Sequence, residues 1–164
     1  MKTEQAPGTL PDARGKRVAV VTAEFYRELA DQLEDGARRA LVACGVSLGD
    51  MTFERVPGCF ELPLAARYLL DAGNDAVVAL GVVVRGDTPH FDFVAGECSR
   101  GLMDVMLAKV APVGFGVLTT ETLAQAQERA DSARGDKGFE AAVAALTVLA
   151  LRGSMSASGL PRDL

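Results

Sequence analysis

Large aromatic side chains are scarce in this chain of 164 residues, which has no tryptophan, two tyrosines and a single histidine. A core without large rings has to be built from valine, leucine and alanine, which favours layered packing of helices on a sheet. A chain of this length suits one domain, and such a domain buries roughly 68–70% of its unfolded surface. It therefore needs no disulfide or metal to hold it together.

Cysteine is also rare. Cys44, Cys59 and Cys98 are odd in number and widely spaced, and they match no zinc or redox motif. Reduced thiols in a cytoplasmic protein are the simplest interpretation, so we expect a cytoplasmic location.

Basic residues do not predominate, since the formal net charge is −5. A nucleic-acid partner is therefore not expected, although a local basic pocket for one small phosphate is compatible with this charge. We find no apolar stretch long and charge-free enough to span a membrane, and the first eight residues lack the apolar region of a signal peptide. We expect no membrane contact.

Strand-like and helix-like segments alternate along the chain. An apolar run without interruption predicts a buried central strand at Ala76–Val84, and an alternating pattern predicts an edge strand at Met51–Val56. Two further strands are predicted at Arg17–Thr22 and Val113–Leu118.

Helices are predicted between and after these strands from apolar residues at helical spacing. A capping-box pattern begins at Thr122, and Asp136 is a candidate N-cap for the last helix. Four of the expected helices cover residues 27–44, 91–109, 122–130 and 136–152. A fifth ends near residue 72 and has Leu62, Ala66 and Leu69 on its inner face.

The order β-α-β-α-β-α-β-α-α predicts an α/β fold, a three-layer αβα sandwich on a parallel sheet. We expect one domain over residues 16–152, with flexible tails at 1–15 and 153–164. All strands then end at one edge, where four loops form what we call the rim: Ala23–Tyr26, Pro57–Glu61, Arg85–His90 and Thr119–Thr122.

Open α/β sheets bind ligands at this edge, and the only histidine, His90, lies there. Histidine is the side chain best suited to move protons near neutral pH. The loop Arg85–His90 opens a helix, so its backbone N–H groups and the Thr88 hydroxyl favour a small anion. The alternative is an ordinary turn with Thr88 as an N-cap.

Two other features of the rim each have two interpretations. A planar heterocycle could be bound by Phe25, Phe60 and Glu61. The other interpretation is that the two rings belong to the core and that the carboxylate is solvated. Arg129 and Lys137 suit a phosphate, or else they are a helix-end cation and a solvated lysine. Periodicity does not decide whether these two residues meet their own rim or that of a neighbouring subunit.

Several separate stretches, in order and at compatible spacing, closely resemble the lumazine synthase family. The resemblance covers roughly residues 17–150. The stretches that carry it are Val56–Pro63 (VPGCFELP), Ala79–Asp92 (ALGVVVRGDTPHFD), Pro112–Thr120 (PVGFGVLTT), Glu128–Ala130 and Lys137–Gly138.

The resemblance implies a flavodoxin-like sheet of strand order 2-1-3-4, pentamers that some members stack into a shell of sixty subunits, and active sites between adjacent subunits. It implies condensation of 5-amino-6-(D-ribitylamino)uracil with 3,4-dihydroxy-2-butanone 4-phosphate to 6,7-dimethyl-8-ribityllumazine, phosphate and water. No metal or organic cofactor is implied. Riboflavin synthase is a candidate partner.

The resemblance also implies a role for each residue that matches a family motif. His90 would transfer protons, and Asp87 and Thr88 would bind the phosphate. Phe25 would stack on the pyrimidine, while the pyrimidine and ribityl groups would be bound by Cys59, Phe60, Glu61, Val82, Val83 and Val84. The adjacent subunit would supply Phe115 to close the ring pocket, Arg129 to pair with phosphate, and Lys137 to assist.

Two residues depart from the family pattern: Tyr26, where the family often has asparagine, and Cys59 at the small position of the VPGxFE motif. The short linker between Arg129 and Lys137 resembles shell-forming members. The main alternative function is a non-catalytic paralogue that binds riboflavin or lumazine. The phosphate-binding residues argue against it, because a flavin carrier has no need of them.

Overall fold

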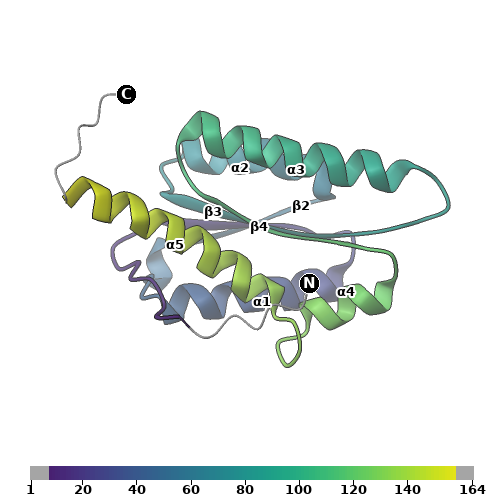
Figure 1. The fold of residues 1–164 in the computed structure, drawn as a ribbon, viewed down its shortest axis with the longest axis horizontal. Coiled ribbons are helices and arrows are strands. Elements are labelled where there is room, and N and C mark those ends of the chain that lie inside the picture. Colours follow the sequence, from purple (N-terminus) through teal and green to yellow (C-terminus); the bar gives the residue numbers. More distant parts are fainter. Residues whose placement is uncertain (1–7, 158–164) are drawn as a thin grey trace.

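The computed structural model describes residues 8–157, which form a four-stranded parallel sheet of order β2-β1-β3-β4 (Figure 1). The strands are β1 (Val18–Ala23), β2 (Met51–Val56), β3 (Ala76–Val84) and β4 (Val113–Thr120). Both the parallel direction and the strand order are as expected. Strand β4 is two residues longer than predicted, because its pairing with β3 continues to Thr120.

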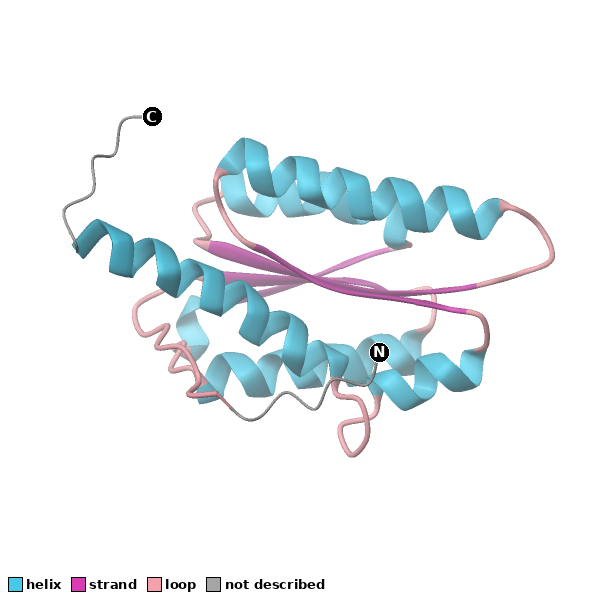
Figure 2. Ribbon diagram, in the orientation of Figure 1, coloured by secondary structure: helices cyan, strands magenta, loops and turns pink. Residues whose placement is uncertain are grey.

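Helices cover both faces of the sheet, which gives the predicted three layers (Figure 2). Helices α2 and α3 lie on one face, and α1, α4 and α5 lie on the other (Figure 1). Short 3-10 turns at Leu48–Asp50 and Cys59–Glu61 precede β2 and α2. The helices are α1 (Arg27–Ala43), α2 (Leu62–Asp71), α3 (His90–Lys109), α4 (Leu123–Ala130) and α5 (Lys137–Ala157).

The core lies on both sides of the two central strands. Every residue of β1 is buried, as are the first seven of β3, because each strand is covered on both faces. The helices on one face come very close together. A Cβ on Gly138 of α5 would collide with the carbonyl oxygen of Leu33 in α1, so only glycine allows these helices this approach.

Helix α2 packs Leu62, Ala66 and Leu69 against the core as expected, and it buries Leu70 more fully than Leu69. Two other local expectations are wrong. Asp136 does not act through its side chain as the N-cap of α5; its carboxylate accepts two hydrogen bonds from the Arg39 guanidinium, at 3.0 and 2.8 Å. Helix α5 continues through Gly153, where we expected a tail, as far as Ala157.

The predicted N-terminal tail is described from residue 8 onward. Residues 8–15 contain no helix or strand. Ala13, however, is buried, and its N–H donates to the carbonyl oxygen of Cys44 at 2.8 Å. This segment therefore packs against the domain. Residues 1–7 and 158–164 of the predicted tails lie outside the described residues.

One described helix, α5, is long and apolar enough by length and composition to cross a membrane, contrary to our expectation from the sequence. The core helix of a soluble protein passes the same test. One face of α5 is in fact packed against the domain, where Ala142, Ala145 and Leu146 are buried.

Candidate active site

The four rim loops meet at the carboxyl edge of the sheet because all four strands run in the same direction. Two of them are also linked by a backbone hydrogen bond, from the N–H of Arg85 to the carbonyl oxygen of Thr120 at 2.9 Å. In Figure 1 the β3–α3 loop and the β4–α4 turn leave the sheet at the same end.

A cleft of about 560 Å³ opens at this edge, and we call it the rim cleft. Three rim loops and the end of β3 line it. Eight of the residues predicted for the site belong to its lining: Phe25, Cys59, Phe60, Glu61, Val82, Val83, Val84 and His90. The structure thus brings together residues that are up to 65 positions apart in the sequence.

The aromatic rings of the rim cleft are exposed, at 76% for Phe25 and 60% for Phe60. Their assignment to the core is therefore wrong, and both rings are accessible to a planar ligand. Tyr26 packs edge-on against Phe25, with ring centroids 5.1 Å apart and an interplanar angle of 67°. Tyr26 also lines the cleft, so this departure from the family pattern is part of the site.

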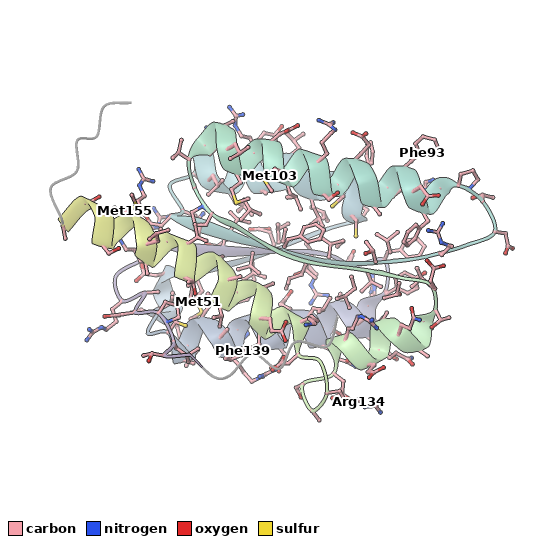
Figure 3. All side chains as sticks on the ribbon, in the orientation of Figure 1. Met51, Phe93, Met103, Arg134, Phe139 and Met155 are labelled. Atoms are coloured by element: carbon pink, nitrogen blue, oxygen red, sulfur yellow. The ribbon has the colours of Figure 1, made fainter. Side chains whose placement is uncertain are left out.

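His90 is the first residue of α3 and is exposed. No described residue forms a hydrogen bond with its imidazole. Phe93 and Val94 line the same cleft, and our sequence analysis missed both. Their spacing of i+3 and i+4 from His90 on a helix was the available signal. Figure 3 shows Phe93 projecting from the start of α3.

The loop before α3 has the features of an anion site. The backbone N–H groups of Gly86, Asp87 and Thr88 donate to no acceptor in the described part of the chain, and the 20-residue helix α3 begins just beyond them. Pro89 occupies the N-cap position without a side-chain hydrogen bond, so Thr88 is not the N-cap. Asp87 and Thr88 precede His90 closely in the chain, but they do not line the rim cleft.

A second cleft of about 370 Å³ lies along β4, the edge strand, beside α4 and α5. Phe115, Arg129 and Lys137 all line this edge cleft, as residues predicted to act together should. Lys137 pairs with Glu140 at 2.5 Å. Arg129 donates only to the carbonyl oxygen of Gln125, at 3.0 Å, and has no carboxylate partner among residues 8–157.

The rim cleft and the edge cleft share no lining residue. A single chain therefore separates the two groups of predicted residues, with His90 in one cleft and Arg129 in the other. Each cleft is open to solvent and incomplete for the expected chemistry. The lining of the rim cleft contains no lysine or arginine to bind phosphate, and the lining of the edge cleft contains no histidine.

The Cys59 thiol of the rim cleft is buried. Loss of solvation raises the pKa of Cys59 to about 12 and that of Cys98, behind it in the core, to about 11. The Cys59 Sγ also contacts the carbonyl oxygen of Val82 at 3.8 Å. Both side chains therefore stay protonated near neutral pH, which does not favour Cys59 as a nucleophile.

A further cavity lies where the strands begin, at the end of the sheet opposite the rim. Its lining includes Lys16, Lys109 and Arg152. Lys109 ends α3 and pairs with Asp71, and Arg152 donates to the carbonyl oxygen of Val110. These two cations complement helix ends and have partners within the chain. No group of three metal-binding side chains occurs within residues 8–157.

An apolar cleft with exposed rings, a histidine and a helix N-terminus at the carboxyl edge of a parallel sheet defines a class of protein. It is an α/β enzyme that acts on small planar and anionic molecules.

Comparison with known proteins identifies the family within this class. A family model described as 6,7-dimethyl-8-ribityllumazine synthase matches residues 15–152. Proteins named 6,7-dimethyl-8-ribityllumazine synthase are similar over most of the chain. The one from Kineococcus radiotolerans is 53% identical over 93% of this chain and 96% of its own length. The one from Xanthobacter autotrophicus is 52% identical over 87% of this chain and 88% of its own length. The one from Azorhizobium caulinodans is 50% identical over 84% of this chain and 87% of its own length.

The chain belongs to the 6,7-dimethyl-8-ribityllumazine synthase family. It is an enzyme of riboflavin biosynthesis that forms 6,7-dimethyl-8-ribityllumazine, which confirms the resemblance seen in the sequence. Membership implies small-molecule substrates and an oligomeric assembly. The alternative of a non-catalytic flavin-binding paralogue has no support in these relatives, all of which are named as synthases.

Proposed function

We propose that the chain condenses 5-amino-6-(D-ribitylamino)uracil with 3,4-dihydroxy-2-butanone 4-phosphate at sites formed by two copies, one contributing the rim cleft and the other the edge cleft. The observation that carries this proposal is the division of the predicted residues between two clefts with no common residue. A chain that needs both groups of residues must combine its rim cleft with the edge cleft of a neighbour.

In this proposal the rim cleft binds the pyrimidine. Phe25 stacks on the ring, and Glu61 accepts hydrogen bonds from ring N–H groups. Phe60 and the backbone of Cys59 hold the ribityl chain, and the three valines that end β3 form the apolar floor. The 60% exposure of Phe60 supports this assignment, because a ring in contact with a ligand has to be accessible.

The phosphate is bound where the loop before α3 meets the edge cleft of the neighbour. Amides near Asp87 and the Thr88 hydroxyl donate to its oxygens, and the neighbour's Arg129 and Lys137 supply positive charge. The neighbour's Phe115, which is 48% exposed, closes the ring pocket. This arrangement stabilises phosphate as a leaving group.

His90 moves the protons of the reaction. Two carbon–nitrogen bonds form and the carbon–oxygen bond to phosphate breaks, while water and phosphate leave. Each step needs a proton taken up or released near neutral pH, which an exposed imidazole at the edge of the cleft can supply. Holding the two reactants together provides a further part of the acceleration.

The test follows lumazine absorbance with both substrates for the wild type, His90→Ala and Arg129→Ala. Loss of a general acid–base group slows turnover by about a hundredfold or more without abolishing it, because binding still brings the reactants together. Arg129→Ala should raise the KM for the sugar phosphate. Arg134→Ala is the matched control, since Arg134 lies on the α4–α5 loop, outside both clefts, and pairs with Asp131 (Figure 3).

A mixture of subunits tests whether the site is shared. When His90→Ala and Arg129→Ala chains are assembled together in equal amounts, about a quarter of the interfaces join an intact His90 to an intact Arg129. Activity should rise above that of either variant alone. A mixture no more active than its components would show that each site lies within one chain and would refute the shared site.

We further propose a homopentamer, which the exposed apolar side chains of α3 and α5 support because such side chains mark contact surfaces. They are Phe93, Met103, Leu107, Val148, Leu151 and Met155. The six-residue linker between α4 and α5 is consistent with stacking into a shell. From the 17.2 kDa chain, light scattering should give about 86 kDa for a pentamer and about 1,000 kDa for sixty subunits.

The proposed location is the cytoplasm, which the buried and reduced cysteines support. Riboflavin synthase is the proposed partner, because the product of this reaction is a riboflavin precursor. Co-purification of tagged chain with riboflavin synthase activity tests the partnership. If riboflavin synthase activity does not co-purify with the tagged chain, the proposed partnership is contradicted.

A further inference from the structure

The Arg85 side chain contacts two other segments next to the rim. Its side chain begins where β3 ends. The guanidinium donates from Nε to Glu121 Oε2 at 2.8 Å, and from its two Nη atoms to the carboxylate of Asp92 at 3.3 and 3.2 Å. Its Cζ lies 4.2 Å from the ring centroid of Phe91. One side chain therefore joins β3, the first turn of α3 and the β4–α4 turn.

These contacts position groups more than they stabilise the fold. Arg85 is 38% exposed, while Asp92 and Glu121 are 60% and 63% exposed, and ion pairs at such sites contribute little to stability. The planar guanidinium nevertheless fixes directions, because its N–H groups point to two carboxylates at once while its flat face covers an aromatic ring. A flexible ammonium group cannot hold this arrangement.

Both ends of the network adjoin residues of the proposed site. On one side, Phe91 and Asp92 follow His90 directly in the first turn of α3, and the loop Gly86–Thr88 lies between Arg85 and that turn. On the other side, Glu121 precedes Thr122, the N-cap of α4, which carries Arg129. The backbone bond from Arg85 to Thr120 brings these two segments together.

We propose that Arg85 is a positioning residue, which fixes the phosphate-binding loop and His90 relative to the turn that leads to Arg129. This inference rests on the proposed function. Arg85 does not line either cleft, so it acts through the groups it holds and does not touch the reacting atoms. In the proposed assembly, each chain gives its rim cleft to one active site and its edge cleft to another. Loss of Arg85 therefore loosens the phosphate-binding groups that the chain supplies to both of these sites.

The inference predicts a selective change in substrate binding. In Arg85→Met the phosphate loop loses its anchor, whereas the loops that bind the pyrimidine keep theirs. Loss of one charge-assisted hydrogen bond to the phosphate lowers affinity by about tenfold or more, so we expect the KM for the sugar phosphate to rise by that factor. The KM for the pyrimidine should change by less than about twofold.

Three variants are compared with the wild type by steady-state kinetics and by calorimetric titration with inorganic phosphate. Arg85→Met removes the charge, and Arg85→Lys keeps the charge without the fork and should recover the KM only in part. Arg100→Met is the matched control, because Arg100, like Arg85, pairs with two carboxylates. These are Glu97 and Asp104, both at 2.6 Å, on α3 and away from the rim. The Arg100→Met variant should match the wild type.

The outcomes separate this inference from the proposed function. Wild-type chain that makes no lumazine refutes the proposed function, while weaker phosphate binding by Arg85→Met than by Arg100→Met would still support the positioning role. Unchanged KM values and unchanged phosphate affinity in Arg85→Met would overturn the inference alone. So would an equal rise in both KM values with a lower unfolding temperature, since general loosening explains that pattern.

Discussion

Gly81, in the middle of β3, decides how close Cys59 can come to the sheet. A Cβ built on Gly81 would lie 2.5 Å from the Cys59 Sγ and 3.1 Å from the Cβ of Ala23. Carbon and sulfur atoms do not approach so closely, so the buried Cys59 has to shift. Gly81→Ala should therefore displace Cys59 by about 1 Å and destabilise the protein by about 1–3 kcal/mol.

The displacement should also reach the site, because Phe60 and Glu61 follow Cys59 directly. We expect the KM for the pyrimidine to rise, while the KM for the sugar phosphate changes less. Stability is measured as the urea midpoint at one fixed protein concentration, since assembly makes it depend on concentration. Gly96→Ala, on the exposed face of α3 with nothing near the new methyl group, is the control and should stabilise by up to about 1 kcal/mol.

A double-mutant cycle tests the cause. Cys59→Ala removes the sulfur atom that the new methyl group would meet, so the combined variant should be more stable than the sum of the two single changes predicts. The expected coupling is about 1–2 kcal/mol. Costs that simply add, or Gly81→Ala as stable as the wild type, would show that the contact with Cys59 is not what requires glycine here.

Two further predictions concern stability. Thr122→Ala removes the hydroxyl that accepts from the Gln125 N–H at 3.2 Å, and it should cost about 1 kcal/mol, whereas Thr147→Ala, in the exposed middle of α5, should cost much less. The pKa values of Cys59 and Cys98 are raised in the folded protein, so above about pH 9 the unfolded thiols ionise while the folded ones stay protonated. The free energy of unfolding therefore falls as the pH rises, by about 1 kcal/mol for each thiol at pH 10. Urea midpoints at pH 8 and pH 10 check this, and a Cys98→Ala variant with the same pH dependence as the wild type would contradict it.

The sheet was predictable because its strands are marked by composition. Ala76–Val84 is apolar throughout, and only a strand covered on both faces requires that, so the predicted and observed bounds agree. The face of α2 was harder. Leu69 and Leu70 are both close to the stripe that begins at Leu62, and packing against α3 decides between them, which periodicity does not reveal.

The end of α5 shows how tertiary contacts override local preference. Gly153 and the serines around it predict a break, and glycine inside a helix costs about 1 kcal/mol relative to alanine. Arg152, however, donates to the carbonyl oxygen of Val110, and the Ser156 hydroxyl donates to the carbonyl oxygen of Arg152. These contacts, together with the packing of Leu149, extend the helix to Ala157.

Sequence motifs predicted which residues form the site but could not show that these residues occupy two clefts. His90 and Arg129 are 39 positions apart, and the topology sends one to α3, on one face of the sheet, and the other to α4, on the opposite face. If one reaction needs both His90 and Arg129, a second chain has to supply one of them. Under the proposed function the fold couples assembly to catalysis, since separating the copies would leave every rim cleft without the neighbour's Arg129 and Lys137 while the domain itself stayed intact.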